Sequence, residues 1–251
     1  MTETSRFGFA HFLAQTDPVG IAVLAILLLM SIASWYLIVL KSVRNRQMRV
    51  RADAFLERFW NAPSLDAIAA EAASSGNEPF GRLAAQGIEA SRHWSRASAA
   101  NLAQAGGRDE FLTRAIRRAI TRETAALESG LTVLASVGST APFVGLFGTV
   151  WGIYHALLGI GSAGNATLDT VAGPVGEALI MTALGLAVAI PAVLAYNAFV
   201  RRNRLLLAEL DGFAHDLHAF LLTGAKLNSG GQPAQIARSG AAQPAPRPGA
   251  A

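Results

Sequence analysis

The chain has 251 residues and a net charge of +4, and 52% of its residues are hydrophobic while only 15% are charged. Soluble domains carry about 25% charged residues, so this composition argues against an ordinary soluble protein. Cysteine is absent, which excludes a disulfide framework, a thiolate nucleophile and a Cys-ligated zinc site.

The first apolar run predicts a membrane-spanning helix over residues 18–40. This run contains no Lys, Arg, Asp or Glu, and a helix needs about 20 mostly apolar residues to cross a bilayer. Asp17 followed by Pro18 predicts the helix start, because the aspartate can cap it and proline loses no hydrogen bond at the first helical position. The run exceeds the roughly 7–15 apolar residues of a cleaved signal peptide, so we expect it to be retained.

The residues after this run predict its orientation. Basic residues accumulate in cytoplasmic segments, so we expect residues 1–17 outside and residues 41–128 inside. The basic residues flank apolar runs and form no compact motif, so nucleic-acid binding is not expected. The basic cluster that follows the first run directly comprises Lys41, Arg44, Arg46, Arg49 and Arg51.

The segment 41–128 is rich in Ala, Arg and Glu and is expected to form helices without a globular core of its own. Its last helix is amphipathic, with Leu112, Ile116 and Ile120 at helical spacing. No helix breaker lies between Arg108 and Ser129, so this helix is expected to continue into the second span.

Two further spans are predicted over residues 129–160 and 174–200, joined by an outer turn over 161–173. Within residues 129–200 the only acidic residues are Asp169 and Glu177, and Lys and Arg are absent. A cytoplasmic helix over 201–222 and a disordered tail over 223–251 follow, the tail because it has few large apolar residues. The predicted fold class is therefore an all-α integral membrane protein with three transmembrane helices, long cytoplasmic extensions, N-terminus outside and C-terminus inside.

Glu177 is the main candidate functional residue. An ionised, unpaired carboxylate in hydrocarbon is costly, so such a residue normally faces a pore, a partner or a relay. Its depth depends on where the helix begins, being about one turn for a start at Pro174 and two to three turns for a start near Leu168. The alternative is a glutamate close enough to the outer end to reach the headgroup layer.

Two threonines in the apolar spans are further candidates. A lone threonine commonly bonds to its own helix backbone, but the antiparallel arrangement allows Thr149 to share the depth of Glu177. Thr182 follows Glu177 by about 140° around the helix, so it need not face the same lumen. His155 is expected to be an interfacial histidine rather than a member of a relay.

Nothing in the sequence predicts an enzyme. The motifs H-E-x-x-H, G-x-x-x-x-G-K-[ST] and G-x-S-x-G are all absent. We therefore predict no catalytic residue, no cofactor and no metal ligand. A solute transporter is disfavoured because the three spans contain no inverted repeat, whereas a scaffold without ion flux would tolerate free replacement of Glu177.

Two segments resemble the ExbB/TolQ/MotA proton-channel family. They are Gly138-Ser-Thr-Ala-Pro-Phe-Val-Gly-Leu-Phe-Gly-Thr-Val-Trp-Gly-Ile153 and Glu177-Ala-Leu-Ile-Met-Thr-Ala-Leu-Gly-Leu-Ala-Val-Ala-Ile-Pro-Ala-Val-Leu-Ala-Tyr-Asn197. Within the family, the Ser-Thr-Ala-Pro-Phe stretch favours the ExbB branch. His155 departs from the residue expected at its position, so the TolQ branch, which serves the Tol-Pal envelope-integrity motor, remains the alternative.

The resemblance implies a homopentamer in the lipid of the bacterial inner membrane, enclosing the single transmembrane helices of an ExbD-like dimer. Proton movement would drive a conformational change that is passed to a TonB-like energy transducer, which powers import of iron chelates and cobalamin through outer-membrane receptors. By the same resemblance, Glu177 is the pore glutamate of a proton relay, and Thr149 and Thr182 are its two functional threonines.

Overall fold

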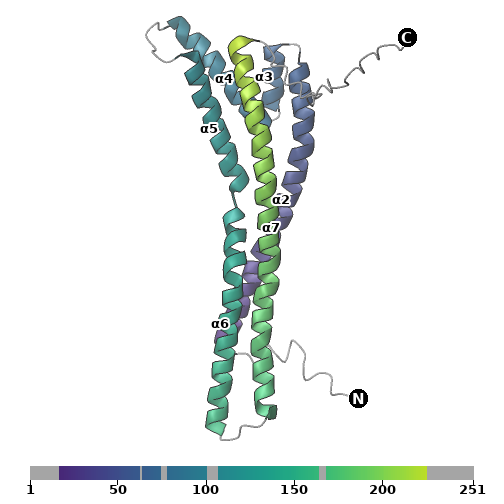
Figure 1. The fold of residues 1–251 in the computed structure, drawn as a ribbon, viewed down its shortest axis with the longest axis vertical. Helices are drawn as coiled ribbons and strands as arrows, with labels where there is room; N and C mark the ends of the chain where they lie inside the picture. The colour runs from purple at the N-terminus through teal and green to yellow at the C-terminus, as the bar shows by residue number, and fades with distance from the viewer. Residues whose placement is uncertain (1–16, 63, 75–77, 101–106, 164–167, 225–251) are drawn as a thin grey trace, which may run out of the picture.

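The computed structural model describes residues 17–62, 64–74, 78–100, 107–163 and 168–224, and the described residues form an elongated bundle of helices (Figure 1). The predicted outer terminus, except Asp17, and nearly all of the predicted tail lie outside the described residues. The described residues confirm the all-α class, and three of their helices are long and apolar enough to cross a membrane. The helices are α2 (Pro18–Asn61), α3 (Leu65–Ser74), α4 (Pro79–Ala100), α5 (Arg108–Glu128), α6 (Leu131–Ala163) and α7 (Leu168–Thr223).

The start of α2 is the one that the sequence predicts. Asp17 is the N-cap, its Oδ1 accepts a hydrogen bond from the Gly20 N–H at 2.8 Å, and Pro18 opens the helix. The helix then continues without interruption for 44 residues, about 66 Å. A single rigid element therefore joins the first span to the segment that carries the basic cluster.

The outer turn is shorter than expected. Helix α6 continues to Ala163 and α7 already runs from Leu168, so helix occupies much of the segment 161–173. At its other end, α7 passes from the third span through residues 201–222 as one helix of 56 residues, as the sequence predicts.

The prediction of a continuous helix from Arg108 into the second span is wrong. Helix α5 ends at Glu128, and α6 begins after Gly130, which has a φ of 77°. Glycine adopts this left-handed conformation without steric cost and commonly ends helices in this way. Gly130, just past the end of α5, is therefore the residue that stops the helix, and a glycine at such a place is a helix-end signal that needs no proline.

Side chains from two other helices satisfy a carbonyl that the break leaves free. The Leu127 carbonyl accepts hydrogen bonds from Lys41 Nζ of α2 and from Asn203 Nδ2 of α7, each at 2.9 Å. A helix C-terminus has carbonyls without partners inside the helix, and here one of them fastens the three long segments together. Lys41, Leu127 and Asn203 consequently mark one level across the bundle.

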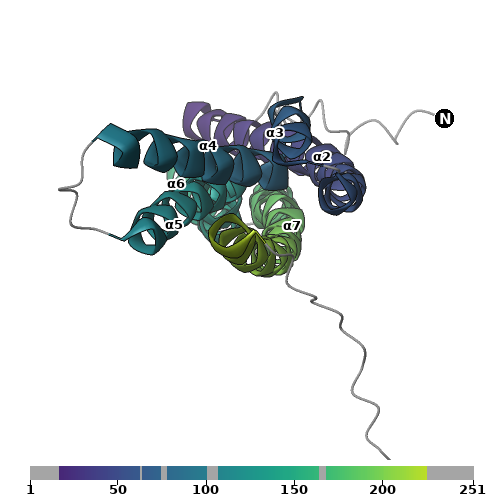
Figure 2. The same ribbon diagram turned by 90° about the horizontal axis from the view of Figure 1, so that it is seen from above.

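Residues 41–128 are expected to have no globular core of their own, and in the structure they form a core together with the end of α7. Helices α3, α4 and α5 gather around the ends of α2 and α7 that lie far from the spans (Figures 1 and 2). Phe59 of α2 and Phe80 of α4 lie 5.1 and 5.6 Å, between ring centroids, from Phe213 of α7. In the sequence, each of these segments has only a narrow stripe of apolar residues at helical spacing. The core forms where the stripes of segments distant in the chain pack together.

A buried ion pair links two of these helices. Arg82 of α4 donates from Nε to Glu123 Oε1 of α5 at 2.7 Å, and a second bond joins its Nη2 to Oε2. The Glu123 side chain is almost fully buried. A buried charge that loses its partner costs several kcal/mol of stability. The pair therefore requires α4 and α5 to pack in the one register that brings both side chains together.

The spans themselves are held by close contact between the backbones of α6 and α7. A Cβ added to Gly145 would lie 2.6 Å from the Met181 carbonyl oxygen, and one added to Gly185 would lie 2.7 Å from the Ala141 carbonyl oxygen. Backbone atoms cannot move aside as a flexible side chain does. Small residues at helix contacts are the usual device by which membrane helices approach closely, and this seam of α6 and α7 uses it.

We predict that Gly145→Ala destabilises the protein, because the new methyl group must push two backbones apart. Overpacking of this kind costs about 1–3 kcal/mol. The matched control is Gly212→Ala in α7, where a Cβ meets nothing within 4 Å. Thermal unfolding in mild detergent, followed by circular dichroism, should show a lower midpoint for Gly145→Ala only. Equal midpoints for the two variants would contradict the close seam.

Candidate functional site

Thr149 and Thr182 meet across the seam of α6 and α7. The Thr149 hydroxyl is hydrogen-bonded to the Thr182 hydroxyl and lies 2.9 Å from the Ala178 carbonyl oxygen and 3.2 Å from that of Gly145. A hydroxyl has one hydrogen to donate and two lone pairs, so Thr149 donates to one of these oxygens and can accept from Thr182. This buried side chain thus bonds to the opposite helix as well as to its own.

The close approach of the two helices explains this pairing. A Cβ on Gly152 would lie 3.1 Å from the Ala178 Cβ, and one on Gly148 would lie 3.1 Å from the Met181 Cβ. With a larger residue at either glycine, Thr149 would not reach the backbone of α7. The sequence left open whether Thr182 faces the same side as the other candidates, and the structure joins it to Thr149.

Glu177 lies one residue before Ala178 and takes no part in these bonds. Its side chain is half-buried, and within the described part of the chain its carboxylate has no hydrogen bond or ion pair. Leu184, about 20° from Glu177 around α7, packs against the core of the spans, whereas Leu186, about 180° away, is 45% exposed. Glu177 therefore lies on the flank of the packed face of α7, between its buried and its exposed surface.

The level of Glu177 follows from the charged end of the spans. Lys41, Leu127 and Asn203 share one level, and a hydrocarbon core of about 30 Å corresponds to about 20 residues of helix. Counting from this level towards the opposite end, which we call the outer end, reaches the region of Ile21, Phe147 and Ala183. Contacts near these residues agree with the count, because a Cβ on Gly148 would touch both Val23 and Met181.

This count places the candidate residues in depth. The Thr149–Thr182 pair lies close to this counted level, and Glu177 lies about 7.5 Å beyond Thr182 along α7, towards the outer end. Helix α7 covers Glu177 from Leu168 onward, which excludes a helix start at Pro174.

A second polar cluster at the outer end was not recognised in the sequence. Asp17 Oδ2 accepts a hydrogen bond from Trp151 Nε1 and lies 3.9 Å from His155 Nε2. Burial alone would raise the pKa of the Asp17 carboxyl, but the bonds from Trp151 and Gly20 and the nearby His155 hold this pKa below its usual value. Asp17 and Trp151 are far apart in the chain, so no local pattern connects them.

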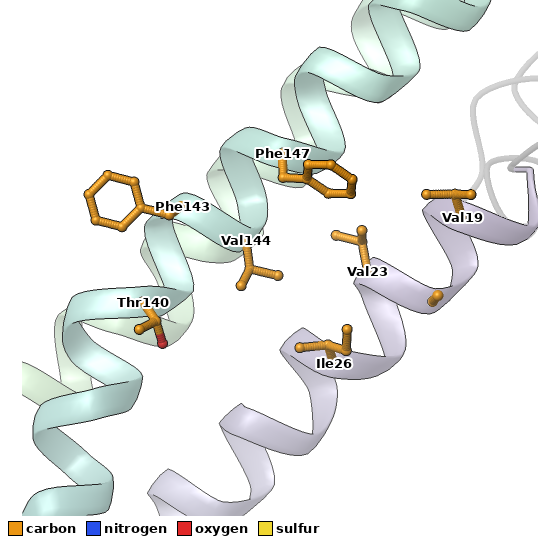
Figure 3. A pocket seen from close by; sticks show the side chains of 8 residues that line it. Val19, Val23, Ile26, Thr140, Phe143, Val144 and Phe147 are labelled. Atoms are coloured by element: carbon orange, nitrogen blue, oxygen red, sulfur yellow. The ribbon is translucent and has the colours of Figure 1, made fainter.

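A groove between α2 and α6 near the outer end offers no chemistry. Its volume is about 410 Å³ and, except for Thr140, its lining is apolar (Figure 3). The Thr140 hydroxyl donates to the Ser136 carbonyl at 2.7 Å, so it is already satisfied within its own helix. Among the described residues, no three His, Asp or Glu side chains gather as a metal site requires.

Comparison with known proteins places these residues in a family context. Residues 75–212 match the MotA/TolQ/ExbB proton channel family. The biopolymer transport protein ExbB of Xanthomonas campestris pv. campestris (strain B100) is 48% identical over 89% of this chain and 92% of its own length, and ExbB of Neisseria meningitidis serogroup A is 45% identical over 82% and 93%. The Tol-Pal system protein TolQ of Pseudomonas aeruginosa is 40% identical over 76% and 82%.

We predict that Thr149 and Thr182 are energetically coupled. Thr149→Val and Thr182→Val each remove one hydroxyl of the pair, so the double variant should lose less stability than the sum of the single losses. Interhelical hydrogen bonds in membranes contribute about 0.6–2 kcal/mol, which sets the expected size of the coupling. Unfolding of the four proteins in detergent measures it, and strictly additive losses would show that the hydroxyls do not interact.

Proposed function

This chain belongs to the MotA/TolQ/ExbB proton channel family, and we propose that it is the channel subunit of a TonB-ExbB-ExbD motor that energises import of iron chelates and cobalamin across the outer membrane. It is a multi-pass protein of the bacterial inner membrane. The observation that carries the proposal is that the family match covers Thr149, Thr182 and Glu177 together. The family is one of proton channels, and we propose no enzymatic activity for this member.

We infer that the N-terminus lies outside and the C-terminus inside. The basic cluster after residue 40 and the arginines after residue 200 lie at one end of the spans, while residues 129–200 contain no Lys or Arg. Positive charge is retained on the cytoplasmic side, and this rule gives the same orientation for all three spans. The hairpin of α6 and α7 then projects into the periplasm.

The position of Glu177 suits the uptake of protons from the periplasm. A carboxylate at the outer boundary is in contact with water, and protonation removes the charge that keeps it out of the hydrocarbon. Thr149 and Thr182 lie about one turn deeper, where their hydroxyls can donate to or accept from the next group of a relay. Glu177 therefore acts as the outer proton acceptor, and the threonine pair as the polar step below it.

The geometry also supports a separate partner in this relay. Thr182 is about 140° from Glu177 around α7, and no described hydrogen bond joins them. Transfer between them needs a bridging group, which an acidic side chain from a single-span, ExbD-like helix would supply. We propose that five copies of this chain enclose such a helix pair and pass the resulting movement to a TonB-like protein.

The same site also fits a TolQ-like role in the Tol-Pal motor, because the proton relay would be identical. Identity to the ExbB relatives of 45–48%, against 40% for the TolQ relative, favours the ExbB role. A strain lacking this gene should lose growth on iron chelates if the ExbB role is right. Sensitivity to detergent with normal chelate use would favour the TolQ role.

We predict that Glu177→Gln assembles normally but loses energy-dependent uptake of iron chelates. Glutamine preserves the size and the hydrogen-bonding capacity of the side chain, but it cannot exchange a proton as an acid. Thr149→Ala should be impaired as well, because it removes one polar step. Uptake is measured in a deletion strain complemented with each variant, with membrane levels checked by immunoblot.

The matched control is Glu209→Gln, which changes an exposed acid on the same helix far from the outer end. It is expected to retain wild-type uptake. If Glu177→Gln showed wild-type uptake at an equal membrane level, Glu177 would not be part of a proton relay and would be a residue that only contacts the headgroups.

A further inference from the structure

The outer end of α2 is tied to α6 by a single carboxylate. Asp17 uses Oδ1 to cap its own helix at the Gly20 N–H, at 2.8 Å, and uses Oδ2 to bind the indole N–H of Trp151. His155, one turn further along α6, places Nε2 3.9 Å from the same Oδ2. One side chain therefore starts the first span and also fixes where that span meets the second.

This contact lies next to the proposed relay. Gly152, the neighbour of Trp151, is opposite Ala178 at the seam, where a Cβ would lie 3.1 Å from the Ala178 Cβ. Ala178 follows Glu177 directly, and its carbonyl contacts Thr149. A shift of Trp151 relative to α2 would thus be passed to the backbone that carries the proton-accepting residue.

The contact contains one histidine, His155, and histidine is the residue type whose charge ordinarily changes between about pH 5 and 8. A protonated imidazole would attract the Asp17 carboxylate, whereas a neutral one would not. Asp17 remains ionised throughout this range, since the bonds it accepts lower its pKa. Acidification therefore adds one favourable charge pair to the contact and removes none.

Other described ionisable groups near His155 do not offset this effect. On α6, Tyr154 lies beside it with ring centroids 6.0 Å apart. On α7, Glu177 is the acid at the outer end whose side chain the structure describes, and it would also attract an imidazolium. The basic clusters stand at the opposite end of the spans, more than about 30 Å away and well beyond the screening length in physiological salt.

We propose that Asp17, Trp151 and His155 form a pH-sensitive contact that holds the first span more firmly against the proton-carrying hairpin as the periplasm becomes acidic. This rests on the proposed function for its biological meaning, but the contact can be tested without it. Asp17 and His155 are positioning residues here, because they act on the relay through Trp151 and the backbone of α6.

The test uses tryptophan fluorescence of the assembled full-length protein in lipid nanodiscs. Subtracting the signal of Trp151→Phe from that of wild type isolates Trp151, whose ring centroid is 5.0 Å from that of His155. Protonated imidazole quenches indole, so the Trp151 signal should fall on acidification from about pH 8 to about pH 5. His155→Gln, with its own Trp151→Phe reference, should abolish the fall, whereas His215→Gln, at an exposed histidine of α7, should keep it.

A second measurement tests whether the Asp17–His155 charge pair stabilises the protein, which quenching of Trp151 by a nearby imidazole would not by itself show. The apparent midpoint of thermal unfolding should rise on acidification more in wild type than in His155→Gln. Asp17→Asn, which can still cap the helix, should lose the same part of the rise, and the double variant should lose no more than either single one. Additive effects, or quenching that persists in His155→Gln, would overturn the proposal. Loss of the relay role for Glu177 would leave both readouts unchanged.

Discussion

Backbone contact between α6 and α7 is the constraint on which the rest of the structure depends. Gly145 and Gly185 lie so close to the opposite helix that even a methyl group on either would overlap a carbonyl oxygen. Only at this separation can Thr149 reach both Ala178 and Thr182 on the other helix. Because hydrocarbon provides no hydrophobic drive between helices, packing and such hydrogen bonds must hold the hairpin together. The geometry of the site and the stability of the hairpin therefore have the same origin.

A second constraint sets the depth of the site. The Leu127 carbonyl binds Lys41 and Asn203, so the charged ends of the three long segments are level. Since α6 and α7 are longer than a bilayer needs, their excess length must appear at the outer end. We propose that Glu177 then lies at the outer mouth of the spans, where water can supply protons, with the threonine pair deeper along the helices. The level of Lys41, Leu127 and Asn203 thus connects the lengths of the helices with the proposed position of the site.

The sequence predicts what depends on local pattern and misses what depends on distant contacts. Charge-free apolar runs and the Asp17–Pro18 cap predict the spans and the start of α2, and a resemblance of two segments predicts the family. The bonds that satisfy the Leu127 carbonyl at the break come from side chains of α2 and α7, and the core around Phe213 depends on stripes from several helices. The pairing of Thr149 with Thr182 and of Asp17 with Trp151 likewise requires a register between helices that no local pattern contains.

The depth and orientation of Glu177 can be tested directly, because the chain contains no cysteine. Single-cysteine variants Glu177→Cys and Val188→Cys place thiols on one face of α7, about 16 Å apart along the helix. A membrane-impermeant maleimide added to spheroplasts, which have lost their outer membrane, should label the cysteine at 177 quickly and the one at 188 hardly at all. Equal labelling of the two, or labelling of the cysteine at 177 only from the cytoplasmic side of inverted vesicles, would contradict an outer proton acceptor.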